Sequence, residues 1–191
     1  MKTFQVTLLA AALSIGHAWA ADDVGLPATP MEMVNQDQLL TILEVMNTVE
    51  IEQAEFALQH AIHADLKALA QRLLDDHTRS NLRIDELKRA DFEPQPSDIS
   101  DQIAVQSGER SDALTNLEAS KFDCVYLSDQ SDLHQLASEL VSRHVESPDA
   151  MSQPVKDFLD RTLVDIDSHS QSLQVLLEQS ICQEIPAEAT R

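Results

Sequence analysis

The chain is poor in glycine and in aromatic residues. Its 191 residues include 3 glycines, and Phe, Trp and Tyr together make up 4%. A turn-rich β fold uses more of both, whereas the abundant alanine, leucine, glutamate and glutamine favour helices. With 43% hydrophobic residues, the composition and length predict one all-α domain with an apolar core.

Positive charge is scarce as well. The 13 Lys and Arg residues face 33 Asp and Glu residues, which gives a formal net charge of −20. Such a surface repels the phosphates of nucleic acids and anionic lipids, so neither is an expected partner. It attracts cations and basic proteins, and it also serves plain solubility. A metal ion or a basic protein is therefore the kind of partner that the charge favours.

Long apolar runs are missing after the first residues. Lys2 precedes an apolar stretch over 6–15, and Ala18-Trp19-Ala20 has the small-x-small form of a signal-peptidase site. This pattern predicts a signal peptide over 1–20, and no cysteine follows it that would carry a lipid anchor. No later stretch is apolar enough to span a membrane. We therefore expect a protein exported to a bacterial periplasm, with association at the outer membrane left open.

Apolar residues recur every three or four positions in four long segments, which is typical of amphipathic helices. The predicted helices span 36–61, 65–90, 111–145 and 153–181. These segments predict an antiparallel, up-down-up-down four-helix bundle over 36–183, with both inter-helix turns at one end.

The remaining segments have no long apolar period. Pro94 and Pro96 end the second predicted helix, and a short helix capped by Ser97 or Asp98 is expected to end near Gly108. Residues 21–35 are predicted to be a flexible lead-in, and residues 184–191 a flexible tail.

Polar residues interrupt the apolar faces at one level. His77 stands in a stripe where a leucine is expected, and similar positions in the other helices are held by Glu50, Gln130, His134 and His169. Counted from the turns at a rise of 1.5 Å per residue, the heights of Glu50 and the three histidines agree within roughly 6 Å. The four side chains are therefore expected to share one slab of the core.

The same calculation of heights along the helices predicts how close the two cysteines of the chain lie. With His134 and His169 at one level, Cys124 faces about residue 179, close to Cys182. An oxidising compartment permits a bond between them. We expect a disulfide that joins the start of the third predicted helix to the end of the fourth.

Two interpretations of the polar layer stay open. In the first, Glu50, His77, His134 and His169 bind one zinc, copper or iron ion. Gln130 shares a face with His134, Asp165 is placed to orient His169, and Tyr126 completes the surroundings of the ion. In the second, no metal binds, Glu50 pairs with a protonated histidine, and the network fixes the register of the helices.

Other chemistry is not indicated. Leu74 and Ile166 stand where the Glu-x-x-His pairs of di-iron bundles need a glutamate, and no nucleophile–base pair or cofactor motif is visible. We therefore expect no enzyme activity. Three further histidines near helix ends are expected to be solvated, namely His60, His63 and His144.

Four blocks of the chain resemble one known family. The run Ala-Gln-Arg-Leu-Leu-Asp-Asp-His-Thr over 70–78, followed by Asn81, is similar to the DUF4142 family of exported bacterial proteins. The other three blocks are Glu50-Ile51 with Phe56-Ala57, Phe122-Asp123 with Tyr126, Gln130 and His134, and Thr162-Leu163 with His169.

The resemblance covers about residues 38–178. Members of this family are often labelled predicted outer membrane proteins and have a ferritin-like four-helix fold. The resemblance therefore implies this fold and export, and it gives only a hint of metal binding. The chain departs from the family pattern at Val164, where a proline is usual, and around 91–93, where a glycine is usual. Cys124 and Cys182 are not part of that pattern.

Overall fold

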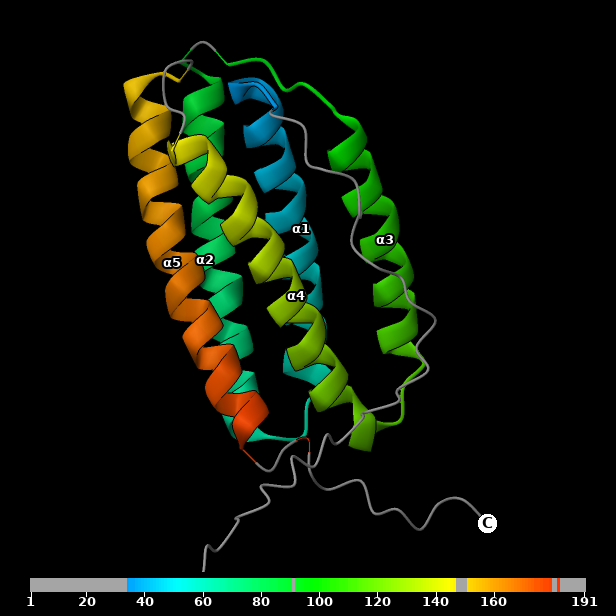
Figure 1. The fold of residues 1–191 in the computed structure, drawn as a ribbon. Coiled ribbons are helices and arrows are strands. Elements are labelled where there is room, and N and C mark those ends of the chain that lie inside the picture. The colour runs from blue at the N-terminus through cyan, green and yellow to red at the C-terminus, as the bar shows by residue number, and fades with distance from the viewer. Residues whose placement is uncertain (1–33, 91, 147–150, 180–181, 183–191) are drawn as a thin grey trace, which may run out of the picture.

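The computed structural model describes residues 34–90, 92–146, 151–179 and 182, and these form five α-helices and no strand. The helices are α1 (Gln36–His60), α2 (Ala64–Lys88), α3 (Asp98–Thr115), α4 (Ala119–Glu146) and α5 (Gln153–Glu178) (Figure 1). The all-α fold is confirmed, and the fifth helix, α3, is longer than the short helix that was expected after Pro96. The predicted signal peptide, residues 21–33 of the lead-in and the tail 184–191 lie outside the described residues.

The four helices that carry the polar layer pack around one another. α1 lies along α2, α4 lies along α5, and further contacts join α2 to α5 and α1 to α4 (Figure 1). α3 lies outside this group against α1, with a smaller contact to α4. Each core helix therefore buries one face against two neighbours, as amphipathic helices require.

The two inter-helix turns lie at opposite ends of the bundle. The backbone amides of Ile62 and His63, between α1 and α2, donate to the carboxylate of Asp123 near the start of α4. The backbone amide of Ser152, just before α5, donates to the side chain of Gln36 at the start of α1, at 2.8 Å. The expected up-down-up-down order of the four helices, with both turns at one end, is therefore wrong.

The helix α3 is the physical reason for this difference. After Pro94 and Pro96 the chain turns back as α3, whose N-cap Ser97 closes a capping box with Ser100. At 1.5 Å per residue, its 18 residues cover about 27 Å. α3 thus returns the chain along the bundle, so α2 and α4 run parallel (Figure 1).

The boundary between α3 and α4 also differs from the expected one. α3 does not end near Gly108 but continues to Thr115, and α4 begins at Ala119 rather than near Ser111. A Cβ at Gly108 would meet nothing within 4 Å, because the residue is exposed within a regular helix. Glycine there costs only helix propensity, about 1 kcal/mol, which the flanking helix tolerates.

The apolar core is divided into two clusters. One gathers residues from the first half of α1, the second half of α2, the end of α4 and the start of α5, among them Leu39, Met46, Ile84 and Ile166. The other gathers the opposite halves of the same helices, among them Ala54, Leu73, Leu127 and Leu173. The polar layer lies between them, since each helix contributes its polar residue between these two apolar sets.

The structure joins Cys124, near the start of α4, to Cys182, just beyond α5, with a Cα–Cα distance of 5.1 Å. None of the described helices is long and apolar enough to cross a membrane.

Candidate metal centre

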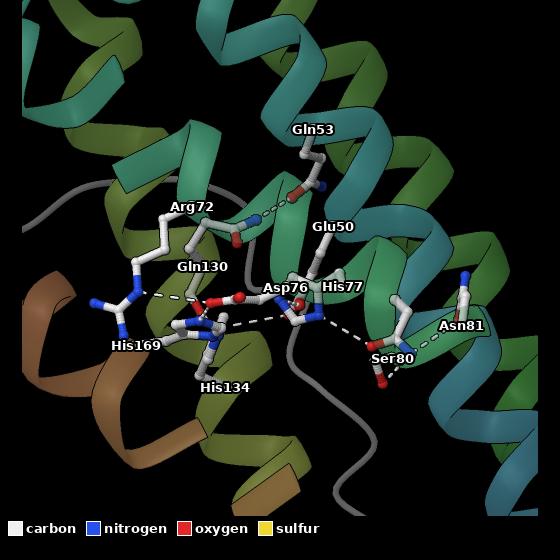
Figure 2. Close-up of polar contacts among 11 residues, drawn as sticks. Glu50, Gln53, Arg72, Asp76, His77, Ser80, Asn81, Gln130, His134 and His169 are labelled. Atoms are coloured by element: carbon white, nitrogen blue, oxygen red, sulfur yellow. Dashed lines mark hydrogen bonds and ion pairs between the residues drawn. The ribbon is translucent and has the colours of Figure 1, made fainter. Parts of the chain in front are cut away.

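Each of the four core helices places one ionisable side chain at the same point of the interior. Glu50 comes from α1, His77 from α2, His134 from α4 and His169 from α5, and at most 9% of any of these residues is exposed. Figure 2 shows the three imidazole rings gathered with the Glu50 carboxylate, between the helices that carry them. The structure thus brings together all four residues that the sequence pattern singles out.

His77 has a fixed orientation. The amide nitrogen of Asn47 donates to Ser80 and Asn81, so its oxygen Oδ1 is free to accept. His77 Nδ1 lies 3.0 Å from that oxygen and donates to it. The other ring nitrogen, Nε2, therefore faces the carboxylate of Glu50, with which it makes a close ion pair.

His134 is oriented in the same manner by its own helix. Its Nδ1 donates to the backbone carbonyl of Gln130 at 2.8 Å, one turn earlier in α4. Glu50 Oε1 lies 3.5 Å from the same nitrogen. The Nε2 atom then points into the cluster, 3.1 Å from Nδ1 of His169.

His169 completes the set from the other side. Its Nε2 lies 2.9 Å from Oδ2 of Asp76, an acceptor-only group when ionised, so Nε2 carries a proton. Asp76 is itself held by Arg79 at 2.7 Å and by Arg72 at 3.6 Å. Arg72 in turn donates to Ser168 of α5, which ties α2 to α5 beside the cluster.

The hydrogen bonds leave three inward nitrogen atoms. Each ring donates one N–H to an oxygen outside the cluster, as metal-binding histidines do. Ligand atoms of His77, His134 and His169 lie within 4.8 Å of one another. The three imidazoles form a nitrogen donor set that suits ions of the zinc, copper or iron type, and the Glu50 carboxylate adjoins it through its contact with His77.

The charges of the cluster depend on one another. Burial raises the pKa of Glu50, but the neighbouring His77 and His134 outweigh it and lower the pKa to about 2. Burial lowers the pKa of His77, yet the Glu50 carboxylate more than compensates and the net pKa is raised. The metal-free protein therefore stabilises an ion pair of Glu50 and protonated His77.

The pKa values of His169 and Asp76, which lie on the other side of the cluster from Glu50 and His77, are shifted for different reasons. Burial lowers the pKa of His169, and the opposing hydrogen bond to Asp76 does not restore it. Burial raises the pKa of Asp76, but its bonds to His169 and Arg79 outweigh this and the net pKa is lowered. A neutral His169 beside an ionised Asp76 leaves a lone pair on His169 Nδ1, which is the state that a metal needs.

The roles expected for the surrounding residues need correction. Asp165 is exposed, and the acceptor that orients His169 is Asp76 of α2. The hydroxyl of Tyr126 has no hydrogen-bond partner among the described residues, and burial together with the nearby Glu50 carboxylate raises its pKa. The Gln130 side chain donates to Gln53 at 2.6 Å, a buried residue that the sequence pattern did not single out.

The other histidines are also corrected in part. His60 and His63 are exposed, as expected. His144 is buried, and its two ring nitrogens lie 2.7 Å from the carbonyl of Leu140 and 3.1 Å from that of Val34. Its position near the end of α4 suggested exposure to solvent, but Val34, two residues before α1, covers it.

A cavity of about 40 Å³ adjoins the cluster. Glu50 and the three histidines form its inner wall. Its outer part is lined by Ser80 of α2 together with Thr162 and Asp165 of α5. The cluster is therefore buried but is not sealed on every side.

Comparisons with known proteins place the chain in one family. No curated protein and no solved structure matches it. The model of a family described as "Domain of unknown function (DUF4142)" matches residues 24–176. The match spans most of the chain and includes the four cluster residues. The chain therefore belongs to the DUF4142 family.

Proposed function

We propose that the protein binds one transition-metal ion through Glu50, His77, His134 and His169. One observation carries the proposal. Each imidazole has its outer nitrogen engaged by an oxygen of Asn47, Gln130 or Asp76, and ligand atoms of the three rings lie within 4.8 Å of one another, with Glu50 against His77. A cluster built only to fill the core has no need of this common orientation.

The donor set favours particular ions. Imidazole nitrogen suits zinc, copper and iron, whereas magnesium and calcium prefer oxygen ligands. The acidic surface, with a net charge of −20, raises the local concentration of cations around the molecule. Zinc and its spectroscopic substitute cobalt are therefore suitable ions for a first test.

The test is a calorimetric titration of metal-free protein with Zn²⁺, Co²⁺, Cu²⁺ and anaerobic Fe²⁺. We expect at least one of them to bind one to one with a Kd below about 1 μM. His134→Ala removes a central ligand, and His60→Ala, at an exposed histidine, is the matched control. The proposal requires at least a hundredfold loss in the first variant and none in the second, with both folded by circular dichroism.

A second candidate function rests on the Glu50–His77 ion pair. This pair satisfies two charges without a metal, so the layer can also serve as a purely structural network. The protein is then a non-enzymatic periplasmic stress or interaction protein whose acidic surface recognises a basic partner. Elemental analysis of protein purified without chelator separates the two, since only the first candidate requires a stoichiometric metal.

The fold supports a finer assignment. α2 and α4 run parallel and are joined by a connection that spans the bundle, and a single long crossover of this kind is typical of ferritin-like bundles. We assign the four helices α1, α2, α4 and α5 to that class, with α3 as the crossover.

Export is part of the same proposal. The charged, apolar and small-x-small pattern of residues 1–20 supports it, and so does the Cys124–Cys182 disulfide, because such bonds persist in oxidising compartments. N-terminal sequencing of the protein from a periplasmic fraction tests it. A mature chain that begins at Ala21 is expected, and an uncleaved cytoplasmic chain contradicts the proposal.

A further inference from the structure

The surroundings of the four-residue cluster differ on its two sides. Toward the end of the bundle where α1 finishes, Leu73, Leu173 and Gln130 are completely buried and close the layer. Toward the other end lies the cavity of about 40 Å³. The residues that line it beyond the cluster include Leu43 and Met46 of α1, Ser80 of α2, Ala137 of α4, and Thr162 and Ile166 of α5.

The chain directions show that these residues share one side. Leu43 and Met46 precede Glu50 in α1, and Ile166 precedes His169 in α5. Ala137 follows His134 in α4, which runs the opposite way. The cavity therefore lies on one side of the cluster, toward the start of α1.

Two carboxylates also line the cavity. Asp76 is engaged by His169 and Arg79, and Asp165 is exposed at the outer part of the cavity. The hydroxyl of Ser80 already accepts from Asn47, and that of Thr162 donates to the carbonyl of Phe158 within α5. Met46 offers only a thioether, a soft sulfur that suits copper(I) better than zinc or cobalt. Apart from the exposed Asp165, the lining thus offers no further ligand for zinc or cobalt, and a coordination position stays available on the cavity side.

We propose that the ion keeps one exchangeable coordination position facing this cavity, occupied by water at rest and open to small inorganic ligands. This inference rests on the proposed metal site. A bound water needs roughly 10–15 Å³, so a cavity of about 40 Å³ has room for water and for a small inorganic ligand. The site is therefore of the open, reactive type and not a closed structural site.

The experiment uses the visible absorption of the Co²⁺-loaded full chain, which reports the number and type of ligands. We expect millimolar azide, a small inorganic ligand, to shift the cobalt bands. Thr162→Leu fills the mouth of the cavity and should weaken azide binding at least tenfold while cobalt stays bound. Val164→Leu, at a residue of the same helix that is 68% exposed, is the matched control.

Ala137→Leu, from another helix, repeats the comparison in case Thr162→Leu loosens α5 and weakens cobalt binding itself. Cobalt bands that do not respond to azide overturn the open position but leave the metal site standing. An unchanged azide response in both filled variants overturns the placement of that position in this cavity. Absence of any cobalt band overturns this inference, and only a failure of all four ions to bind contradicts the metal site itself.

Discussion

Nε2 of His134 lies 3.1 Å from Nδ1 of His169, and the other nitrogen of each ring already donates to an oxygen. In two neutral rings, both facing nitrogens then carry lone pairs, which repel each other. Either a shared proton or a cation relieves this repulsion. Two nitrogens bound to one tetrahedral zinc ion at the usual 2.0–2.1 Å lie about 3.3 Å apart. The observed spacing is therefore close to what a bound metal imposes.

The contact between Asp76 and His169 leads to the first prediction. The Asp76 carboxylate accepts the proton of Nε2 and so keeps the lone pair of His169 on Nδ1, inside the cluster. Asp76→Asn can present an amide N–H instead, which favours the wrong tautomer. We expect the variant to bind Zn²⁺ 10- to 100-fold more weakly, measured by competition with a chromophoric chelator.

Asp75→Asn is the matched control for this variant. Asp75 is the preceding residue of α2, exposed and hydrogen-bonded only to Gln71 among the described residues. It changes the net charge by the same amount without touching His169. Equal affinities of the two variants would show that Asp76 acts only through long-range charge.

The height of the polar layer along the bundle could be predicted from the sequence, because it depends on local helix geometry alone. The helical period places Glu50, His77, His134 and His169 on the buried faces, and the fixed rise per residue brings them to one height. The predicted heights of these residues stay nearly correct although the predicted topology is wrong, because the cluster lies near the middle of the bundle. Reversing a helix about its middle moves such residues very little.

Two other features depend on how helices far apart in sequence meet. A connection of about twenty residues can return the chain to either end of a bundle, so the course of α3 does not follow from helical periods. The contact of Asp76 with His169 requires a particular rotation of α2 against α5. Asp165 satisfied the spacing rule within one helix, but the partner came from a neighbouring helix. Local spacing alone cannot decide between such alternatives.

The α3–α4 interface leads to a prediction about pH. Burial raises the pKa of Asp129 to about 6, against the attraction of Arg110 and with a smaller contribution from Asp132. Its ordinary value is 3.8, so between these values the folded protein binds more protons than the unfolded chain. The contribution of Asp129 to the free energy of unfolding therefore falls as pH rises from about 4 to about 6.

Asp129→Asn removes this pH dependence. We expect the variant to be more stable than the parent by on the order of 2 kcal/mol at pH 7.5, and the gain to disappear near pH 4. Urea unfolding at the two pH values measures it. Asp132→Asn is the control, because Asp132 also faces Arg110 but its side chain is 50% exposed. A less stable Asp129→Asn protein at pH 7.5 would mean that the Arg110 contact outweighs burial.

The ion pair of Glu50 and His77 leads to the last prediction, which concerns the metal-free protein. His77→Leu restores the apolar stripe of α2 but leaves the buried Glu50 carboxylate without its nearest cation. Breaking a buried pair in this way costs about 3 kcal/mol. Glu50→Met with His77→Leu removes both charges, so the double variant should be more stable than the sum of the two single effects allows, by about 2 kcal/mol.

Urea unfolding in the presence of a chelator measures this coupling. The pKa of His77 is raised in the folded state, so its charge contributes stability that is complete below the ordinary value of 6.5 and is lost as pH rises through the raised value. The coupling should therefore be large at pH 6 and shrink at high pH. Glu52→Met, at an exposed glutamate of α1, serves as the control and should not couple to His77→Leu. Additive effects at pH 6 would mean that His134 alone compensates the charge of Glu50, and that His77 is held in place only by packing and by Asn47.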